Sequence, residues 1–150
     1  MVMDLLPNTV ILSFASEIKL IATKYFGMDP LKKNRHLLQQ IGQKFREIDP
    51  DIWVKILLSK IPVDKNVVID DLRMPNEYTA LLENGFTIIR LNVQPSVQLE
   101  RLKRIYPSNW EDHIKRLEHD TEVLLQHYRF DVEINSNTLG DLSTAISKIV

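Results

Sequence analysis

The sequence is organised around residues 67–78, VVIDDLRMPNEY. The β-branched run at 67–69 predicts a strand buried on both faces, and two carboxylates, Asp70 and Asp71, follow it directly. In open α/β sheets, ligands bind at the carboxyl ends of the strands. Two acids followed by Arg73 at such an end therefore predict a site for a metal ion, a phosphate group or both.

The same residues also predict the start of a helix. Pro75 is placed to be the first residue of that helix, and Glu77 lies in its first turn. Asp70 and Asp71 would then do no more than cap it. The pattern alone leaves the ligand site and the helix cap as open alternatives.

Length and composition indicate one ordinary globular domain. The chain has 150 residues, 26% of them charged, a formal net charge of −1 and no cysteine. This composition gives no broad positive field for nucleic acid, so any phosphate site is expected to be local. The lack of cysteine excludes disulfides, thiolate metal sites and cysteine nucleophiles. No apolar run approaches the roughly 18 residues that span a membrane, and we expect a cytoplasmic protein.

Strands and helices are predicted to alternate. Strands are expected at 9–14, 67–73, 86–93 and 131–135, and helices at 15–26, 29–47, 52–61, 75–84, from 95 to an interruption at 106–109, at 110–128 and at 139–150. The second and third strands, with the helix between them, are expected to form a β-α-β unit. The alternation predicts a three-layer α/β/α domain in which all four strands share one mainly parallel sheet.

The helix predicted to start at Asp29 and Pro30 has two different faces. Its core positions are expected at Leu31, Leu38, Ile41 and Phe45. A second line along the helix is formed by Arg35, Gln39, Gly42 and Arg46. Two arginines and a glutamine around a glycine could form a shelf on which an anion rests close to the backbone. The alternative is a solvated face that contains a glycine costing ~1 kcal/mol.

Several segments in order resemble one family. SFASEIK at 13–19, RHLLQQIGQKFREIDPDIW at 35–53, VVIDDLRMPNEY, HDTE at 119–122 and a closing strand with Asn135 are similar to the phage-type deoxynucleoside monophosphate kinases. The match is more distant to animal-type phosphomevalonate kinase. These proteins are P-loop kinases with the nucleoside monophosphate kinase fold, and the resemblance covers roughly residues 10–150. It favours the anion shelf over the solvated face.

One feature of this family is missing. Its members begin with a strand and a G-x-x-x-x-G-K-[ST] loop that holds the ATP phosphates. The only glycines of this chain are Gly27, Gly42, Gly85 and Gly140, and none precedes a lysine. We therefore expect a single kinase-like domain, 1–150, that is N-terminally incomplete: it lacks the first strand, which normally lies in the middle of the sheet, and the Walker A loop.

The resemblance implies roles for individual residues. Arg46 and Arg73 would bind the phosphate of the acceptor, and the residues around the acceptor itself would be Ser13, Phe14, Arg35, Gln39 and Trp53. Asp70 or Asp71 would face Mg²⁺ or the acceptor, with Asp71 also a candidate catalytic residue. Arg101 and Arg104, three residues apart on one helix face, would stabilise the transferring phosphoryl group. The alternative for these two arginines is solvated helix charge beside Glu100.

Phosphoryl transfer from ATP to a (deoxy)nucleoside monophosphate is the activity that the resemblance implies, with ATP and Mg²⁺ as cofactors. Without the phosphate loop we expect this chain to be inactive, because phosphoryl transfer depends on positioning and electrostatic stabilisation of phosphates. The alternative is a non-catalytic nucleotide-binding or protein-interaction module without cofactors. We expect no nucleic-acid partner and no membrane partner. The oligomeric state stays open, with a homodimer as one option.

Overall fold

The computed structural model describes residues 6–117 and 124–149. The chain divides into two compact units, which we call the N-terminal unit (residues 8–72) and the C-terminal unit (residues 73 onward, with Leu6 and Pro7). Each unit contains helices and one pair of short parallel strands, so the predicted mixed α/β class with parallel strands is confirmed.

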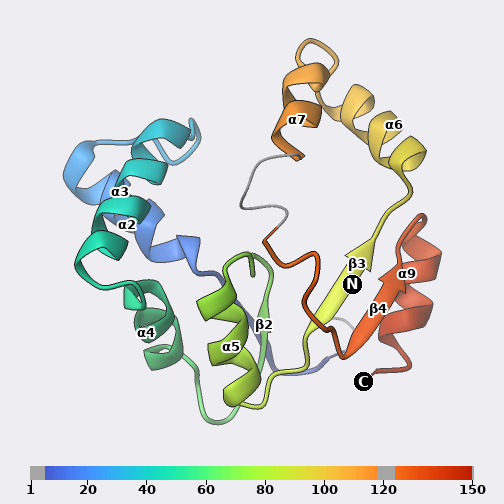
Figure 1. Ribbon diagram of the computed structural model, residues 1–150, viewed down its shortest axis with the longest axis horizontal. Helices are drawn as coiled ribbons and strands as arrows, with labels where there is room; N and C mark the ends of the chain where they lie inside the picture. Colours follow the sequence, from blue (N-terminus) through green and yellow to red (C-terminus); the bar gives the residue numbers. More distant parts are fainter. Residues whose placement is uncertain (1–5, 118–123, 150) are drawn as a thin grey trace. The chain divides into compact units, whose positions relative to one another are not determined.

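The N-terminal unit contains the elements β1 (Thr9–Leu12), α2 (Ala15–Phe26), α3 (Arg35–Ile48), α4 (Ile52–Ser59) and β2 (Asn66–Ile69). β1 and β2 pair in parallel, with Leu12 opposite Ile69. The three helices pack against one another (Figure 1). The buried apolar side chains lie in and beside these helices: Phe14, Ile18, Ala22, Met28, Ile41, Trp53, Val54 and Leu57.

The C-terminal unit contains α5 (Pro75–Glu83), β3 (Ile89–Asn92), α6 (Pro95–Ile105), α7 (Trp110–Leu117), β4 (Val132–Asn135) and α9 (Leu139–Ile146). β3 and β4 pair in parallel, with Leu91 opposite Ile134. α9 packs on β4, and α6 and α7 form a helical hairpin (Figure 1). The buried apolar side chains here are Leu81, Ile88, Ile134 and Ile146.

The expectation of one four-stranded sheet is not met by the strand pairing. Among residues 6–117 and 124–149, the strands form two parallel ladders, β1 with β2 and β3 with β4, in place of the expected four-stranded sheet. A hydrophobic pattern predicts which residues of a strand face a core, but it does not predict which other strand will pair with it. Each ladder consequently has two strands and two outer edges.

The central strand is less buried than its sequence predicts. Val67, Val68 and Ile69 are half-buried, and no residue of β1 or β2 is fully buried. Ile11 of β1 keeps 52% of its surface exposed. The β-branched run forms the expected strand, but the core of this unit lies among the helices.

Helix boundaries follow the strongest local signals. α2 ends at Gly27 and α5 ends before Gly85, and both glycines have positive φ (64° and 75°), as C-terminal stops predict. The helix predicted from Asp29 begins only at Arg35, because Asn34 accepts a hydrogen bond from the backbone N–H of Leu37 and caps it there.

Two further expectations need correction. Asp29, expected to cap a helix, accepts a hydrogen bond from the N–H of Leu31 in a turn. Leu31, expected in the core, is 93% exposed. Of the long helix expected at 110–128, Trp110–Leu117 is α7, and residues 124–127 form turns, so the helix does not reach 128. Tyr128 packs edge-on against Tyr78, with ring centroids 4.9 Å apart. The segment 119–122 lies outside the described residues.

Candidate functional site

Asp71 joins the carboxyl ends of β1 and β2. Its Oδ2 accepts hydrogen bonds from the Ser13 hydroxyl at 2.6 Å and from the Ala15 N–H at 3.0 Å, and its Oδ1 accepts from the Phe14 N–H at 2.9 Å. The parallel register places these groups together, because Ser13 directly follows β1 and Asp70 directly follows β2. The predicted residues Ser13, Phe14 and Asp71 therefore form one half-buried cluster.

This geometry assigns Asp71 a capping role at a different helix from the one expected. The first backbone N–H groups of α2 have no partner within the helix, and a carboxylate there also interacts favourably with the helix dipole. Asp71 therefore caps α2 and not the helix that begins at Pro75. Ala15, the first residue of α2, lies 56 positions before Asp71 in the sequence. Asp70 is exposed and makes no hydrogen bond or ion pair with the part of the chain that the structure describes.

The resemblance implies that Asp70 or Asp71 faces Mg²⁺ or the acceptor, and the hydrogen bonds to Asp71 leave it little room for direct coordination. Both of its oxygens already accept hydrogen bonds, and Mg²⁺ requires near-octahedral oxygen coordination. Within residues 6–117 and 124–149, no group of three His, Asp or Glu side chains lies close enough to hold a metal ion. Asp70 offers one exposed carboxylate, which suits an ion held mainly by water and phosphate.

The space over Gly42 is filled. A Cβ built on Gly42 would lie 3.3 Å from Nη1 of Arg46 and 3.4 Å from Cδ1 of Ile18. Arg46, one of the residues of the predicted shelf, therefore lies close against the backbone of Gly42. Arg35 and Gln39, on the same line of α3, are exposed.

Trp53 lies behind this part of α3. It is only 2% exposed, and its Nε1–H donates to the carbonyl oxygen of Gly42 at 3.2 Å. Its ring stacks on Phe45, with centroids 5.3 Å apart. Trp53 can therefore support the site from within, but little of its surface is available to a ligand.

A small cavity connects three of the predicted residues. Ser13, Phe14 and Trp53 line a space of about 30 Å³ in the N-terminal unit. A cavity of this size holds about one water molecule, whereas ligand pockets typically measure roughly 300 to 1,000 Å³. The cavity cannot enclose a nucleoside, so any nucleotide on this unit would lie largely at its surface.

Arg73 belongs to the C-terminal unit and stands just before α5. Its backbone N–H and that of Met74 both donate to Oε2 of Glu77, at 3.0 Å each. Glu77 is 3% exposed, so this carboxylate fixes the turn that carries Arg73. The sequence predicted Glu77 in the first turn of this helix, but it did not predict that the side chain would be buried, because burial depends on packing.

The two arginines expected to stabilise the transferring phosphoryl group have different surroundings. Arg101 donates from Nη2 to the carbonyl oxygens of Asn137, at 2.6 Å, and Ser136, at 3.3 Å. It thereby ties α6 to the segment that follows β4. Arg104 is exposed on the same helix, as expected for solvated helix charge. A larger hollow of about 620 Å³ lies between β4 and α9, and none of the predicted site residues lines it.

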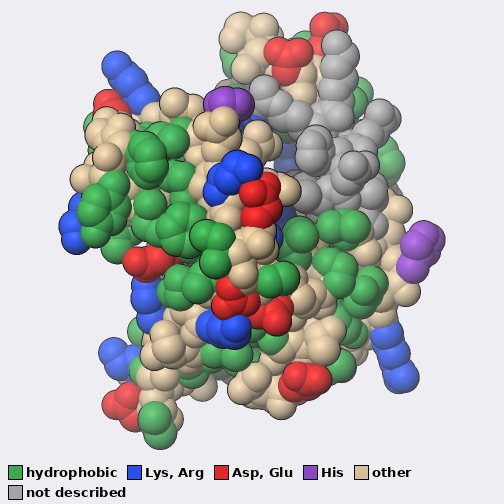
Figure 2. All heavy atoms as spheres, turned by 60° about the vertical axis from the view of Figure 1, so that its left-hand side comes forward, with side chains coloured by type: hydrophobic (Ala, Val, Ile, Leu, Met, Phe, Trp, Pro, Cys, Tyr) green, Lys and Arg blue, Asp and Glu red, His purple; other side chains and the backbone are tan. Residues whose placement is uncertain are grey.

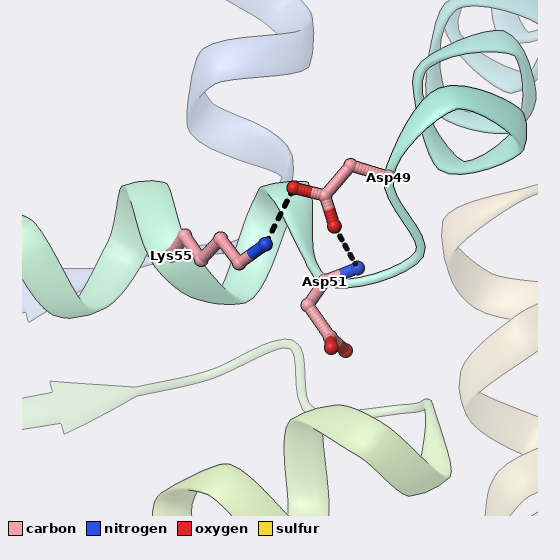
Figure 3. Close-up of polar contacts among 3 residues, drawn as sticks. All are labelled: Asp49, Asp51 and Lys55. Atoms are coloured by element: carbon pink, nitrogen blue, oxygen red, sulfur yellow. Dashed lines mark hydrogen bonds and ion pairs between the residues drawn. The ribbon is translucent and has the colours of Figure 1, made fainter.

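An ion pair fastens the junction between α3 and α4. Lys55 donates to Oδ2 of Asp49 at 2.6 Å, and Oδ1 of Asp49 accepts from the N–H of Asp51 at 3.1 Å (Figure 3). The Lys55 hydrogen bond and then the Asp51 hydrogen bond lower the pKa of Asp49 below its ordinary 3.8. The hydrogen bond to Asp49 raises the pKa of Lys55 above its ordinary 10.5.

Lys55→Met should remove a small, pH-dependent stabilisation. The lowered pKa of Asp49 stabilises the fold above pH 3.8 and ceases to do so as the pH falls through the folded-state pKa. The raised pKa of Lys55 stabilises it below pH 10.5 and ceases to do so as the pH rises through the folded-state pKa. Urea unfolding of the unmodified chain and of Lys55→Met should be measured across pH. The difference in their free energy of unfolding should be constant between pH 3.8 and pH 10.5 and should shrink outside this range. A difference that grows in acid would contradict this assignment.

No described helix is both long enough and apolar enough to cross a membrane. No protein-family model matches the chain, and neither the curated proteins nor the solved structures contain a match.

Proposed function

We propose that this chain is a deoxynucleoside monophosphate kinase-like protein of the P-loop type that retains acceptor-binding residues and does not transfer phosphoryl groups by itself. The proposal includes a cytoplasmic location and a (deoxy)nucleoside monophosphate as ligand. ATP and Mg²⁺ enter only through the resemblance to that family.

The observation that carries the proposal is the cluster of Asp71 with Ser13, Phe14 and Ala15. Two of the segments on which the resemblance depends, SFASEIK and VVIDDLRMPNEY, meet there at the carboxyl ends of adjacent parallel strands. This is where ligands bind in open α/β sheets. The capping role of Asp71 is compatible with such a site, because it fixes the turn that would face the ligand.

The strand pairing supports the fold part of the proposal. The resemblance expects one further parallel strand in the middle of the sheet, and this strand is missing from the sequence. A sheet without its middle strand leaves two separate ladders, and the described part of the chain has two ladders of two strands each. The half-buried side chains of β1 and β2 are also expected for a sheet that lacks a neighbouring strand.

Arg46 is the residue of the N-terminal unit best suited to meet a phosphate group. Its guanidinium is half-buried beside Gly42, and arginine can bind phosphate through two parallel hydrogen bonds. The cavity lined by Ser13, Phe14 and Trp53 is too small for a nucleoside. The proposal therefore assigns most of the binding energy to the phosphate rather than to the base.

The purified chain should show no ATP-dependent kinase activity on any of the four deoxynucleoside monophosphates. No backbone loop or lysine of the Walker A type is present in its sequence to hold the ATP phosphates. The measurement is a coupled assay of ADP release with each monophosphate in turn. Turnover of about 1 to 100 per second, the usual range for kinases, would contradict the proposal.

A second candidate function is a protein-interaction module derived from such a kinase. It is favoured by the apolar side chains that the N-terminal unit exposes, among them Tyr25, Phe26, Leu31 and Ile48. Figure 2, in which the side of α2, α3 and α4 comes forward, shows hydrophobic side chains at the surface. Contiguous exposed apolar surface often marks an interaction site. Failure to bind any monophosphate would favour this second function.

A further inference from the structure

Gly42 occupies a position in α3 where a glycine is unfavourable for the helix alone. Glycine inside a helix costs ~1 kcal/mol relative to alanine. Gly42 is nevertheless buried, next to Ile18 of α2 and in hydrogen-bond contact with Trp53 of α4. Its backbone has the ordinary φ of a helix, since the positive-φ glycines of the described chain are Gly27 and Gly85. The advantage of glycine here is therefore space.

Arg46 uses that space. It lies one helical turn after Gly42, and side chains in helices point back toward the preceding turn. Its Nη1 would be 3.3 Å from a Cβ at Gly42, a contact tighter than side chains normally make. The absence of a Cβ thus lets the guanidinium lie close against the helix backbone.

Trp53 holds the same turn of α3 from the other side. Its indole N–H is bonded to the carbonyl of Gly42, and its ring stacks on Phe45, the residue before Arg46. Trp53 is almost fully buried, whereas Phe45 is 38% exposed. One side chain therefore contacts this turn of α3 at the backbone of Gly42 and at the ring of Phe45.

We propose that Gly42 and Trp53 are positioning residues that hold the guanidinium of Arg46 ready for a phosphate group. This inference rests on the proposed function, since it names how the phosphate of the acceptor is recognised. A free arginine side chain samples many rotamers, and immobilising such a side chain on binding weakens affinity. Arg46 held against Gly42 has already lost much of that freedom before the anion arrives.

The main test is Gly42→Ala, with Gly140→Ala as a matched control. Both glycines lie in helices, but a Cβ at Gly140 would make only an ordinary contact, 3.6 Å from Oγ1 of Thr138. Gly140→Ala should keep or slightly raise the thermal unfolding temperature, because alanine favours the helix. In Gly42→Ala the close contacts with Arg46 and Ile18 oppose that gain. Only Gly42→Ala should displace the guanidinium of Arg46.

The readouts are the NMR signal of the Arg46 Nε–H and its response to titration with inorganic phosphate and with deoxynucleoside monophosphates. Gly42→Ala should move this signal and weaken phosphate binding about 2- to 12-fold, the equivalent of immobilising one long side chain. Gly140→Ala should change neither. Trp53→Phe, which removes the indole N–H and keeps an aromatic ring, should shift the Arg46 signal and weaken binding in the same direction.

An unchanged Arg46 signal and unchanged phosphate affinity in folded Gly42→Ala would overturn the inference. If Gly42→Ala does not fold, the same two results in Trp53→Phe would overturn it. Failure of the proposed function is a different result: the Arg46 signal of the unmodified chain would not respond to phosphate or monophosphates, although Gly42→Ala still displaced it.

Discussion

Asp71→Ala should lower the free energy of unfolding of the N-terminal unit by about 2 to 4 kcal/mol. The carboxylate accepts three hydrogen bonds, two of them from backbone N–H groups at the start of α2. Alanine would leave those N–H groups without a partner in a half-buried place. Losing the cap would also remove the hydrogen bonds that join Asp71, after β2, to the start of α2.

The measurement is urea unfolding followed by the fluorescence of Trp53 in a Trp110→Phe background. Trp110 lies in the C-terminal unit, so its removal leaves one tryptophan that reports on the N-terminal unit. This separates the two units, whose unfolding need not be a single transition.

Two companion variants make this prediction specific. Asp70→Ala removes the neighbouring, exposed carboxylate and should change stability by less than about 0.5 kcal/mol. Asp71→Asn keeps the shape of the side chain but places an NH₂ group opposite either the Phe14 N–H or the Ala15 N–H. It should therefore be destabilised nearly as much as Asp71→Ala. Equal effects of Asp70→Ala and Asp71→Ala would contradict the assigned cap.

Local structure could be predicted where the signal lies in neighbouring residues. Gly27 and Gly85 end their helices as expected, because only a residue that tolerates positive φ fits there. Asp29 and Pro30 carried an equally good start signal and failed. Both Asp29 and Asn34 can cap this helix, and Asn34 is the residue that does so. Which of two such residues caps a helix depends on small energy differences.

The partners of the site residues could not be predicted, because they come from distant parts of the sequence. Asp71 finds its donors 56 to 58 positions earlier, and Trp53 finds its acceptor at Gly42 on a neighbouring helix. The hydrophobic pattern predicted a strand that ends directly before two carboxylates. It contained no information that this carboxylate would accept hydrogen bonds from the start of α2.

Burial of the central strand was overestimated for a related reason. A β-branched run predicts a strand that can be buried on both faces, but burial requires neighbours. β2 pairs with β1 alone among the strands of the described chain, so its side chains stay half-buried. The hydrophobic pattern shows that the strand can be buried, and the neighbouring elements determine how much of it is buried.

Arg46→Ala should weaken the binding of deoxynucleoside monophosphates by roughly 1.5 to 3 kcal/mol, about 10- to 150-fold in Kd. This is the range for hydrogen bonds to a charged group, and the proposal gives Arg46 such bonds to the phosphate. Isothermal titration calorimetry at low ionic strength is the measurement. Binding by the unmodified chain should also weaken as salt rises, because part of the attraction is between exposed charges.

Lys44→Ala is the matched control for Arg46→Ala. It removes one positive charge from the same helix, and Lys44 is an exposed residue that pairs with Glu47 at 2.8 Å. It should leave the Kd almost unchanged, because its side chain points to solvent. Equal losses in the two variants would indicate a general charge effect and would contradict a specific phosphate contact at Arg46.

The most direct test of the account is an NMR titration of the intact chain with a deoxynucleoside monophosphate. We predict saturable shifts in the backbone signals of Ser13, Phe14 and Ala15 and in the Nε–H signal of Arg46. Inorganic phosphate should shift the same signals with weaker affinity. No shift at millimolar monophosphate, or shifts confined to the hollow between β4 and α9, would contradict the proposed monophosphate site.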